Sequence, residues 1–237
     1  MTDDSELSGL DPYELLDTEA ARIDAYLASI PDDDQAWDQP TRCADWNRRQ
    51  LLAHLASTES YHHACLDDTL DAFIAKGIEG GATDVTSFNA LGVAEHEGRE
   101  PSAMLAEWRD LNARTREQLR ERGDRDMTTM VGPYPSRWQS FHVAVELATH
   151  ADDLDVPVTE DEAPQRLAWR ANVSRFVIAE SKPDVSLSRS ADGQTVVTGQ
   201  GIQATVDDLT LVEGVAGRLA PSGPLDDDQR ALLGATP

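Results

Sequence analysis

The feature that most constrains the fold of this 237-residue chain is the spacing of its apolar residues. Between residues 12 and 155 they recur mainly at three- and four-residue steps, which is typical of amphipathic α-helices, and strand-like alternation is absent. Asn47 and Gln50 form a capping-box pair, and Pro101 suits the first turn of a helix. Four long helices are expected, over residues 12–30, 47–75, 101–123 and 136–155. They predict a four-helix bundle, in which facing side chains commonly build metal or ligand sites.

The pattern changes after residue 157, where one helix is expected over residues 164–181. Short alternating runs separated by glycine turns then predict a small hairpin sheet at 184–190, 194–199 and 202–206. A last amphipathic stretch, at 209–219, precedes an acidic tail. The expected fold class is mainly α, with a metal-binding bundle domain over residues 1–156 and a small α+β segment over 157–237. The run Gly132-Pro133-Tyr134-Pro135 is interpreted as a helix breaker.

Charge and composition narrow the function classes. The 44 acidic and 20 basic residues give a net charge of −24, which repels phosphate backbones and anionic lipid surfaces. We therefore expect neither nucleic acid nor membrane as a partner. The N-terminal sequence lacks the basic and apolar regions of a signal peptide, and no apolar run approaches the ~20 residues that span a bilayer. A soluble, cytoplasmic protein is expected, with Cys43 and Cys65 reduced.

The sequence HVAVELATHADDL, residues 142–154, contains the first candidate metal ligands. Glu146 and His150 are four residues apart, so both side chains can reach one ion from a single helical face. His142 is eight residues from His150, about 12 Å along the helix, which is too far for both to bind the same ion. The alternative interpretation is that these polar residues form the solvent-facing strip of an otherwise buried helix.

A third ligand must come from another helix, and His54 is the best-placed candidate because it lies on the apolar side of residues 47–75. Two histidines and one carboxylate form a catalytic zinc arrangement that leaves a coordination position open, and they also suit other divalent ions. The alternative is a core histidine bonded to a carbonyl. His62 is expected over the leucines and His63 in solvent, whereas Cys65 is about 16 Å along the helix from His54 and is not expected to be a ligand.

Two segments resemble a known family. PTRCADWNRRQLLAHLASTE (residues 40–59) is similar to the loop and second helix of the DinB-like, mycothiol-dependent maleylpyruvate isomerase family, and AVELATHADDL (residues 144–154) is similar to its fourth-helix signature. By this resemblance Cys43 and Trp46 match the loop motif, whereas the family's metal-binding triad is matched by His54, Glu146 and His150. The resemblance implies Zn²⁺ or another divalent metal, mycothiol as a co-substrate, and compatibility with a homodimer.

The isomerase itself is expected to share only the bundle, because its C-terminal domain is expected to be larger than residues 157–237.

The expected function is that of a metal- and thiol-dependent transferase or isomerase acting on a small electrophilic substrate. The metal would hold the sulfur of the small thiol as a thiolate. Thr58 and Tyr61 are candidates for lining the substrate pocket, with ordinary interhelical packing as the alternative, and Arg137 for pairing with a carboxylate, with a solvated arginine as the alternative. A non-catalytic DinB-like binding or stress-response module and a metal-assisted hydrolase are the competing hypotheses. The open ligand set favours an enzyme, since structural zinc sites are usually closed by four protein ligands.

Overall fold

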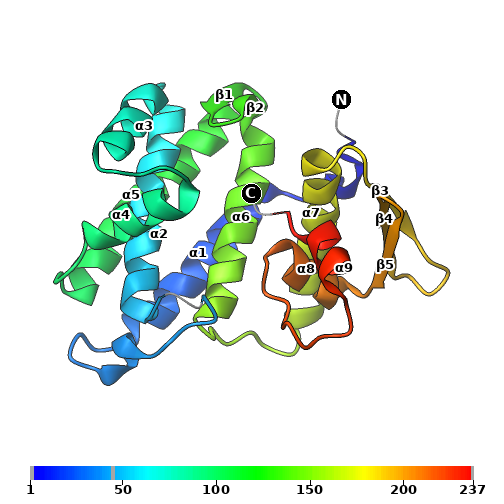
Figure 1. Cartoon of the computed structure of the whole chain (residues 1–237). Coiled ribbons are helices and arrows are strands. Elements are labelled where there is room, and N and C mark those ends of the chain that lie inside the picture. The colour runs from blue at the N-terminus through cyan, green and yellow to red at the C-terminus, as the bar shows by residue number, and fades with distance from the viewer. Residues whose placement is uncertain (1–2, 44–45, 236–237) are drawn as a thin grey trace. The chain divides into compact units, whose positions relative to one another are not determined.

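The computed structural model describes residues 3–43 and 46–235, which form a mainly α-helical protein with a small sheet near the C-terminus, as the sequence predicts (Figure 1). The chain divides into two compact units. One comprises residues 11–156, and the other combines residues 1–10 with residues 157–237. The sequence-based division into domains 1–156 and 157–237 stays a prediction, and the compact units differ from it in the position of the first ten residues.

The four expected long helices are present in the larger unit, at α1 (Pro12–Ala28), α2 (Arg48–Leu66), α5 (Pro101–Arg122) and α6 (Ser136–Asp153). Helix α2 packs against α5, and α1 packs against both α5 and α6 (Figure 1). Their apolar faces form a core that includes Leu16, Ile23, Leu51, Met104, Trp108 and Phe141. A short 3-10 helix, η2 (Gln35–Asp38), precedes the loop that leads into α2.

The helix expected over residues 47–75 is two helices, so that prediction is wrong at its C-terminal end. Helix α2 ends at Leu66, and α3 (Leu70–Glu79) begins after a turn in which Asp68 has a φ of 56°. Aspartate tolerates this left-handed conformation better than most residues, which lets the chain change direction here. A further helix, α4 (Val85–Ala94), was not predicted. It approaches α2 so closely that a Cβ at Gly92 would lie 2.6 Å from Ser57 Cβ.

The Gly-Pro-Tyr-Pro run is a strand and not only a breaker. Strand β1 (Asp126–Thr129) pairs antiparallel with β2 (Gly132–Pro135), and α6 begins at the next residue. Proline donates no backbone hydrogen bond, so it is tolerated in a strand only at an edge. A two-stranded sheet consists of edge strands alone, which is why both prolines fit.

The smaller unit contains η1 (Ser5–Leu7), α7 (Ala163–Ser181), α8 (Asp208–Val215) and α9 (Asp227–Leu233). The predicted hairpin sheet is confirmed as β3 (Ser186–Arg189), β4 (Thr195–Gly199) and β5 (Ile202–Val206), paired antiparallel in that order. Buried Arg175 of α7 forms ion pairs with Glu6 at 2.7 Å and Asp208 at 3.2 Å. These contacts hold the N-terminal residues in this unit. Part of the expected acidic tail forms α9.

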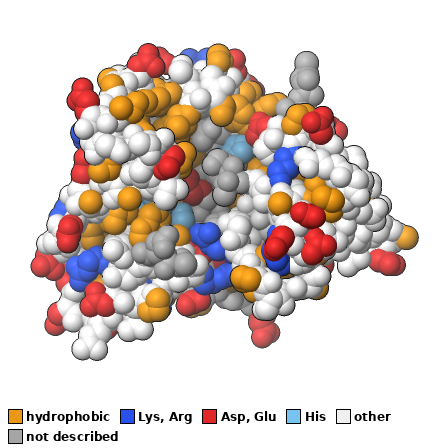
Figure 2. Space-filling view, in the orientation of Figure 1, with side chains coloured by type: hydrophobic (Ala, Val, Ile, Leu, Met, Phe, Trp, Pro, Cys, Tyr) orange, Lys and Arg blue, Asp and Glu red, His pale blue; other side chains and the backbone are white. Residues whose placement is uncertain are grey.

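Apolar side chains gather on the surface of the larger unit over α3, α4 and the β1–β2 hairpin (Figure 2). The exposed residues of these elements include Ile78, Val85, Met130 and Val131. Within the described parts of the chain, none of the helices is long and apolar enough to cross a membrane.

Candidate metal centre

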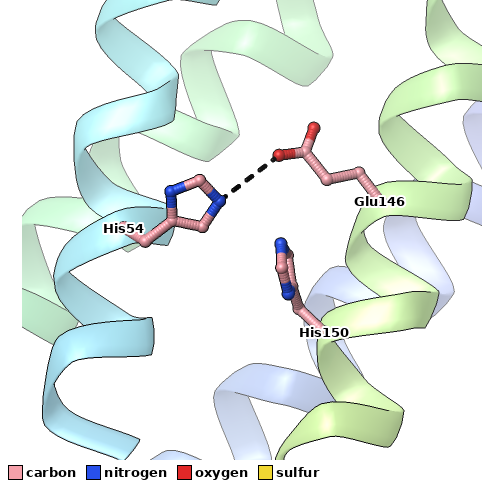
Figure 3. A group of neighbouring side chains, drawn as sticks. All are labelled: His54, Glu146 and His150. Carbon is pink, nitrogen blue, oxygen red and sulfur yellow. Dashed lines mark ion pairs between the residues drawn. The ribbon is translucent and has the colours of Figure 1, made fainter. Parts of the chain in front are cut away.

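The side chains of His54, Glu146 and His150 point toward one another from α2 and α6 (Figure 3). One potential ligand atom from each residue lies within 4.8 Å of the other two. The His54 Nε2 atom is 3.8 Å from Glu146 Oε1, and the two imidazole rings are nearly perpendicular, with centroids 5.0 Å apart. Among residues 3–43 and 46–235, this is the one cluster of three or more such side chains close enough to share an ion.

Burial differs across the three side chains. Both histidines are buried, whereas the Glu146 side chain is 26% exposed. Burial, followed by the charges of His150 and His62, lowers the pKa of His54 to about 3, against an opposing effect of Asp153. His54 is therefore neutral near pH 7, and the neutral imidazole is the form that binds a metal.

The far side of each imidazole has its own oxygen neighbour. Thr58 Oγ1 lies 3.5 Å from His54 Nδ1, and Asp153 Oδ2 lies 3.1 Å from His150 Nδ1. Metal-binding histidines commonly donate their second N–H to a carboxylate in this way, which fixes the ring and its tautomer. In both rings this arrangement leaves Nε2 for an ion. Sequence reasoning gave Asp153 no role, although its three-residue spacing from His150 was a usable signal.

The loop before α2 covers His54. The Trp46 ring lies over the His54 imidazole, with centroids 4.5 Å apart and planes inclined by 33°. The Thr41 hydroxyl donates to the Trp46 carbonyl at 2.8 Å, and the Arg42 amide donates to the Asp153 carbonyl at 3.1 Å. The loop is thereby fastened to the end of α6 that carries His150.

The remaining predicted residues lie around or away from this cluster. His142 is outside it, with Nε2 2.9 Å from the Tyr134 hydroxyl. The Tyr61 hydroxyl lies 3.5 Å from the Met130 amide of the hairpin, and burial raises the pKa of Tyr61. Arg137 lies over the Phe141 ring at 5.8 Å and is nine residues from Glu146, about 180° around α6. The structure does not bring Arg137 to the cluster.

Two neighbouring histidines differ from their expected environments. His62 is buried, and its Nδ1 atom lies 3.4 Å from Oε2 of Glu59, itself a buried carboxylate. His63, expected in solvent, is half-buried, with Nε2 3.1 Å from the Leu111 carbonyl oxygen. The His63 ring therefore meets α5, on which α2 packs, whereas the His62 ring meets Glu59, which itself accepts hydrogen bonds from α5. Helical periodicity gives the direction of a side chain but not the helix that it meets.

The fold and the clustered side chains define a DinB-like helical bundle whose candidate ligands come from two helices. The chain belongs to the family of the mycothiol maleylpyruvate isomerase N-terminal domain, whose model matches residues 16–155. This confirms the resemblance inferred from the sequence.

Two solved structures share the fold. One is the mycothiol-dependent maleylpyruvate isomerase, with 17% identity, a TM-score of 0.65 and 97% of each chain covered. The other is a mutant of that isomerase in which one histidine is replaced by alanine, with 17% identity, a TM-score of 0.63, and 92% of this chain and 93% of that chain covered. The expectation of a larger C-terminal domain in the isomerase is therefore wrong, since so much of both chains is matched. No curated protein matches the sequence. The family to which the chain belongs is that of an enzyme, mycothiol maleylpyruvate isomerase.

Proposed function

We propose that this protein is a divalent-metal-dependent enzyme that uses a low-molecular-weight thiol, mycothiol, for isomerisation of or S-transfer to a small electrophilic substrate. The observation that carries the proposal is the convergence of His54, Glu146 and His150 within 4.8 Å in a chain of this family. The solved relatives are mycothiol-dependent maleylpyruvate isomerase, which makes maleylpyruvate the first substrate to test.

The residues present fit a divalent ion. Two ligands at ~2.1 Å from a tetrahedral zinc ion are about 3.4 Å apart, and the 3.8 Å between His54 and Glu146 is close to that separation. Two imidazoles and one carboxylate occupy three of four positions and leave one for a small molecule. A bound ion would supply one kind of chemistry, which is to stabilise the thiolate form of a coordinated thiol at neutral pH.

The protein's own residues would orient and shield this centre. Asp153 and Thr58 hold the rings of His150 and His54 from behind, and Trp46 covers one face of His54. The partly exposed carboxylate of Glu146 marks the side of the cluster that is accessible to a thiol. By positioning both reactants beside one another, such a site would raise the rate of their reaction.

The test is an assay of the purified, Zn²⁺-loaded protein with maleylpyruvate and with 1-chloro-2,4-dinitrobenzene, each with and without added mycothiol. We expect turnover that disappears when the thiol is dialysed out and returns in proportion as it is added. His150→Ala should abolish this turnover, whereas His142→Ala, a histidine on the same helix but outside the cluster, should retain it.

Three outcomes would contradict the proposal. Turnover of either compound without any thiol would indicate metal-assisted hydrolysis. Equal thiol-dependent turnover in wild-type and metal-free His150→Ala protein would show that the reaction does not require the ion. A metal-loaded protein that neither binds mycothiol nor turns over either compound would indicate a binding module.

A further inference from the structure

A second polar cluster lies inside the bundle, between α2 and α5, and the proposed metal chemistry does not use it. The Glu59 carboxylate is 2% exposed and accepts hydrogen bonds from Asn112 at 2.8 Å and Thr115 at 2.5 Å. His62 Nδ1 lies 3.4 Å from the same carboxylate. The carboxylate is thus surrounded by one imidazole and two side chains of α5.

The orientation of the Asn112 amide in this cluster is fixed by Arg116 and Asp17. Arg116 donates to Oδ1, the side-chain amide oxygen of Asn112, at 2.9 Å, and Arg116 in turn pairs with Asp17 at 2.5 Å. An amide whose oxygen faces an arginine must present its NH₂ group on the other side. Asn112 therefore donates to Glu59, and the free lone pairs of the carboxylate are left to the imidazole.

The outer nitrogen of His62 is available to a ligand. Since Nδ1 faces Glu59, the group that remains is Nε2, and within the described part of the chain no residue forms a hydrogen bond with it. An imidazole with one nitrogen held by a carboxylate and the other without a protein partner is placed to exchange a proton with a molecule bound beside it.

His62 lies beside the metal-ligand face of α2. It is eight residues after His54, which puts it about 80° around the helix and about 12 Å along it, between His54 and the α5-facing Glu59. Burial acts to lower the pKa of His62, but the hydrogen bond and charge of Glu59, together with the charge of Glu146, raise it above its ordinary value. The charge of Glu146 of α6 acts on His62, and the charge of His62 acts on His54, so the imidazole lies within electrostatic range of the candidate metal ligands.

The other polar side chains on this part of α2 do not exchange protons near neutral pH. Burial raises the pKa of Tyr61, whose hydroxyl is bonded to Cys65, and burial also raises the pKa of the Cys65 thiol. The Thr58 hydroxyl donates a hydrogen bond to the His54 carbonyl oxygen at 3.0 Å. His62 is the group of this surface that can give and take a proton.

A purely structural role accounts poorly for such a cluster. Replacing a buried ion pair by apolar residues of similar volume is often neutral or stabilising, because the desolvation cost of the charges offsets their attraction. Perturbed titratable groups held by several partners next to a reactive centre are typical of functional sites.

We propose that His62, held by Glu59, is a catalytic acid–base residue of the thiol-dependent reaction; this inference rests on the proposed function. When the sulfur of the small thiol adds to a double bond conjugated to a carbonyl, a C–S bond forms and the π electrons move to the carbonyl oxygen. The Nε2–H of His62 donates its proton to that oxygen. After rotation about the new single bond, Nε2 takes the proton back, the carbonyl re-forms and the C–S bond breaks, which releases the thiol unchanged.

The experiment compares His62→Gln, Glu59→Gln and the matched control His63→Gln, whose histidine is the next residue of α2 and also faces α5. All are assayed as Zn²⁺-loaded protein with maleylpyruvate and mycothiol, and zinc content and mycothiol binding are measured alongside. We expect His62→Gln to lower kcat about 100-fold or more, with zinc content and mycothiol affinity unchanged. His63→Gln should stay within a few-fold of wild type.

The pH dependence of kcat in Glu59→Gln separates the two roles, because a purely structural role of His62 would leave it unchanged. The titratable groups that act on His62 or lie beside it are Glu59 and His54 of α2, Glu146 of α6, and Tyr61, whose ring centroid is 5.8 Å away. Loss of the Glu59 charge should shift the alkaline limb of the kcat profile to lower pH, because less of the imidazole stays protonated. In ¹⁵N NMR titrations, the His62 imidazole of the wild type should keep its second proton to higher pH than the same imidazole in Glu59→Gln.

The failures of the two proposals are distinguishable. Active wild-type protein together with an equally active, zinc-loaded His62→Gln would overturn the acid–base role alone. An alkaline limb unmoved in Glu59→Gln would overturn the acid–base role as well. So would a His62 imidazole that loses its second proton at the same pH in wild type and in Glu59→Gln, and this measurement does not require His62→Gln to fold. Wild-type protein without thiol-dependent turnover would overturn the proposed function and this role together.

Discussion

The Oδ2 atom of Asp153 lies 3.1 Å from the Nδ1 atom of His150, one turn back along α6, and the Asp153 side chain is fully buried. A buried carboxylate behind an imidazole holds the ring in one orientation and keeps the proton on the nitrogen that faces away from an ion. Asp153 therefore completes the candidate metal centre without contacting an ion itself.

Asp153→Asn should weaken zinc binding about 10- to 100-fold and leave the helical content unchanged, because the amide keeps the shape but loses the charge that orients His150. Competition with a chromophoric chelator measures the affinity. Asp155→Asn is the matched control, since this residue is exposed just beyond α6 and asparagine also tolerates its φ of 57°. Equal affinities in the two variants would show that the Asp153 contact has no bearing on metal binding.

His150→Ala and His54→Ala should each purify with far less zinc than wild type, because an ion held by three protein ligands loses one of them. His142→Ala should retain the wild-type content, since its ring is bonded to Tyr134 and not directed at the cluster. Elemental analysis gives the metal content, and circular dichroism verifies the fold. Zinc loss in His142→Ala with full content in His54→Ala would show that the ligand set is assigned wrongly.

The two cysteines should differ in reactivity and neither should affect the metal. Cys65 is completely buried and burial raises its thiol pKa, whereas Cys43 is partly exposed. In native protein at pH 8, a disulfide reagent should modify Cys43 rapidly and Cys65 only on unfolding in urea, because the thiolate is the reactive form. Cys43→Ser and Cys65→Ala should both retain zinc. Metal loss in either variant would make that cysteine a ligand.

The Glu59–His62 pair should impose a pH dependence on stability. The folded-state pKa of His62 is raised above its ordinary value of 6.5. The stability that the imidazolium contributes is therefore complete below pH 6.5 and is lost as the pH rises through the raised folded pKa. The wild-type free energy of unfolding should decrease above pH 6.5 relative to Glu59→Gln, in which the imidazolium loses the charge of its hydrogen-bonded partner.

Urea unfolding between pH 6 and pH 9, at a fixed concentration of free zinc, measures this difference. All other titrating groups are shared by the two proteins and cancel in the comparison. If the free energy of unfolding depends on pH in the same way in wild type and Glu59→Gln over this range, then Glu59 does not raise the pKa of His62 in the folded state.

Much of this fold is local in origin, and the sequence by itself determined that part. The four bundle helices follow from apolar residues at three- and four-residue spacing and from their caps, such as the Asn47–Gln50 capping box. The pairing of Glu146 with His150 has the same origin, since two residues four apart on a helix are neighbours in every fold that keeps the helix. The position of His54 on the apolar side of its helix made it the best-placed third ligand, and family resemblance in two short segments indicated the same three residues.

Contacts between distant segments were decided only by the tertiary structure. The turn at Asp68, which divides the expected second helix, and the proline-containing strand β2 both depend on packing and pairing that local periodicity does not encode. Sequence spacing could not join Glu59 to Asn112 and Thr115, because these residues lie more than fifty positions apart and meet only where α2 packs on α5. A side chain's direction is set by its own helix, but its partner, and hence its charge and chemistry, is set by the helix that it meets.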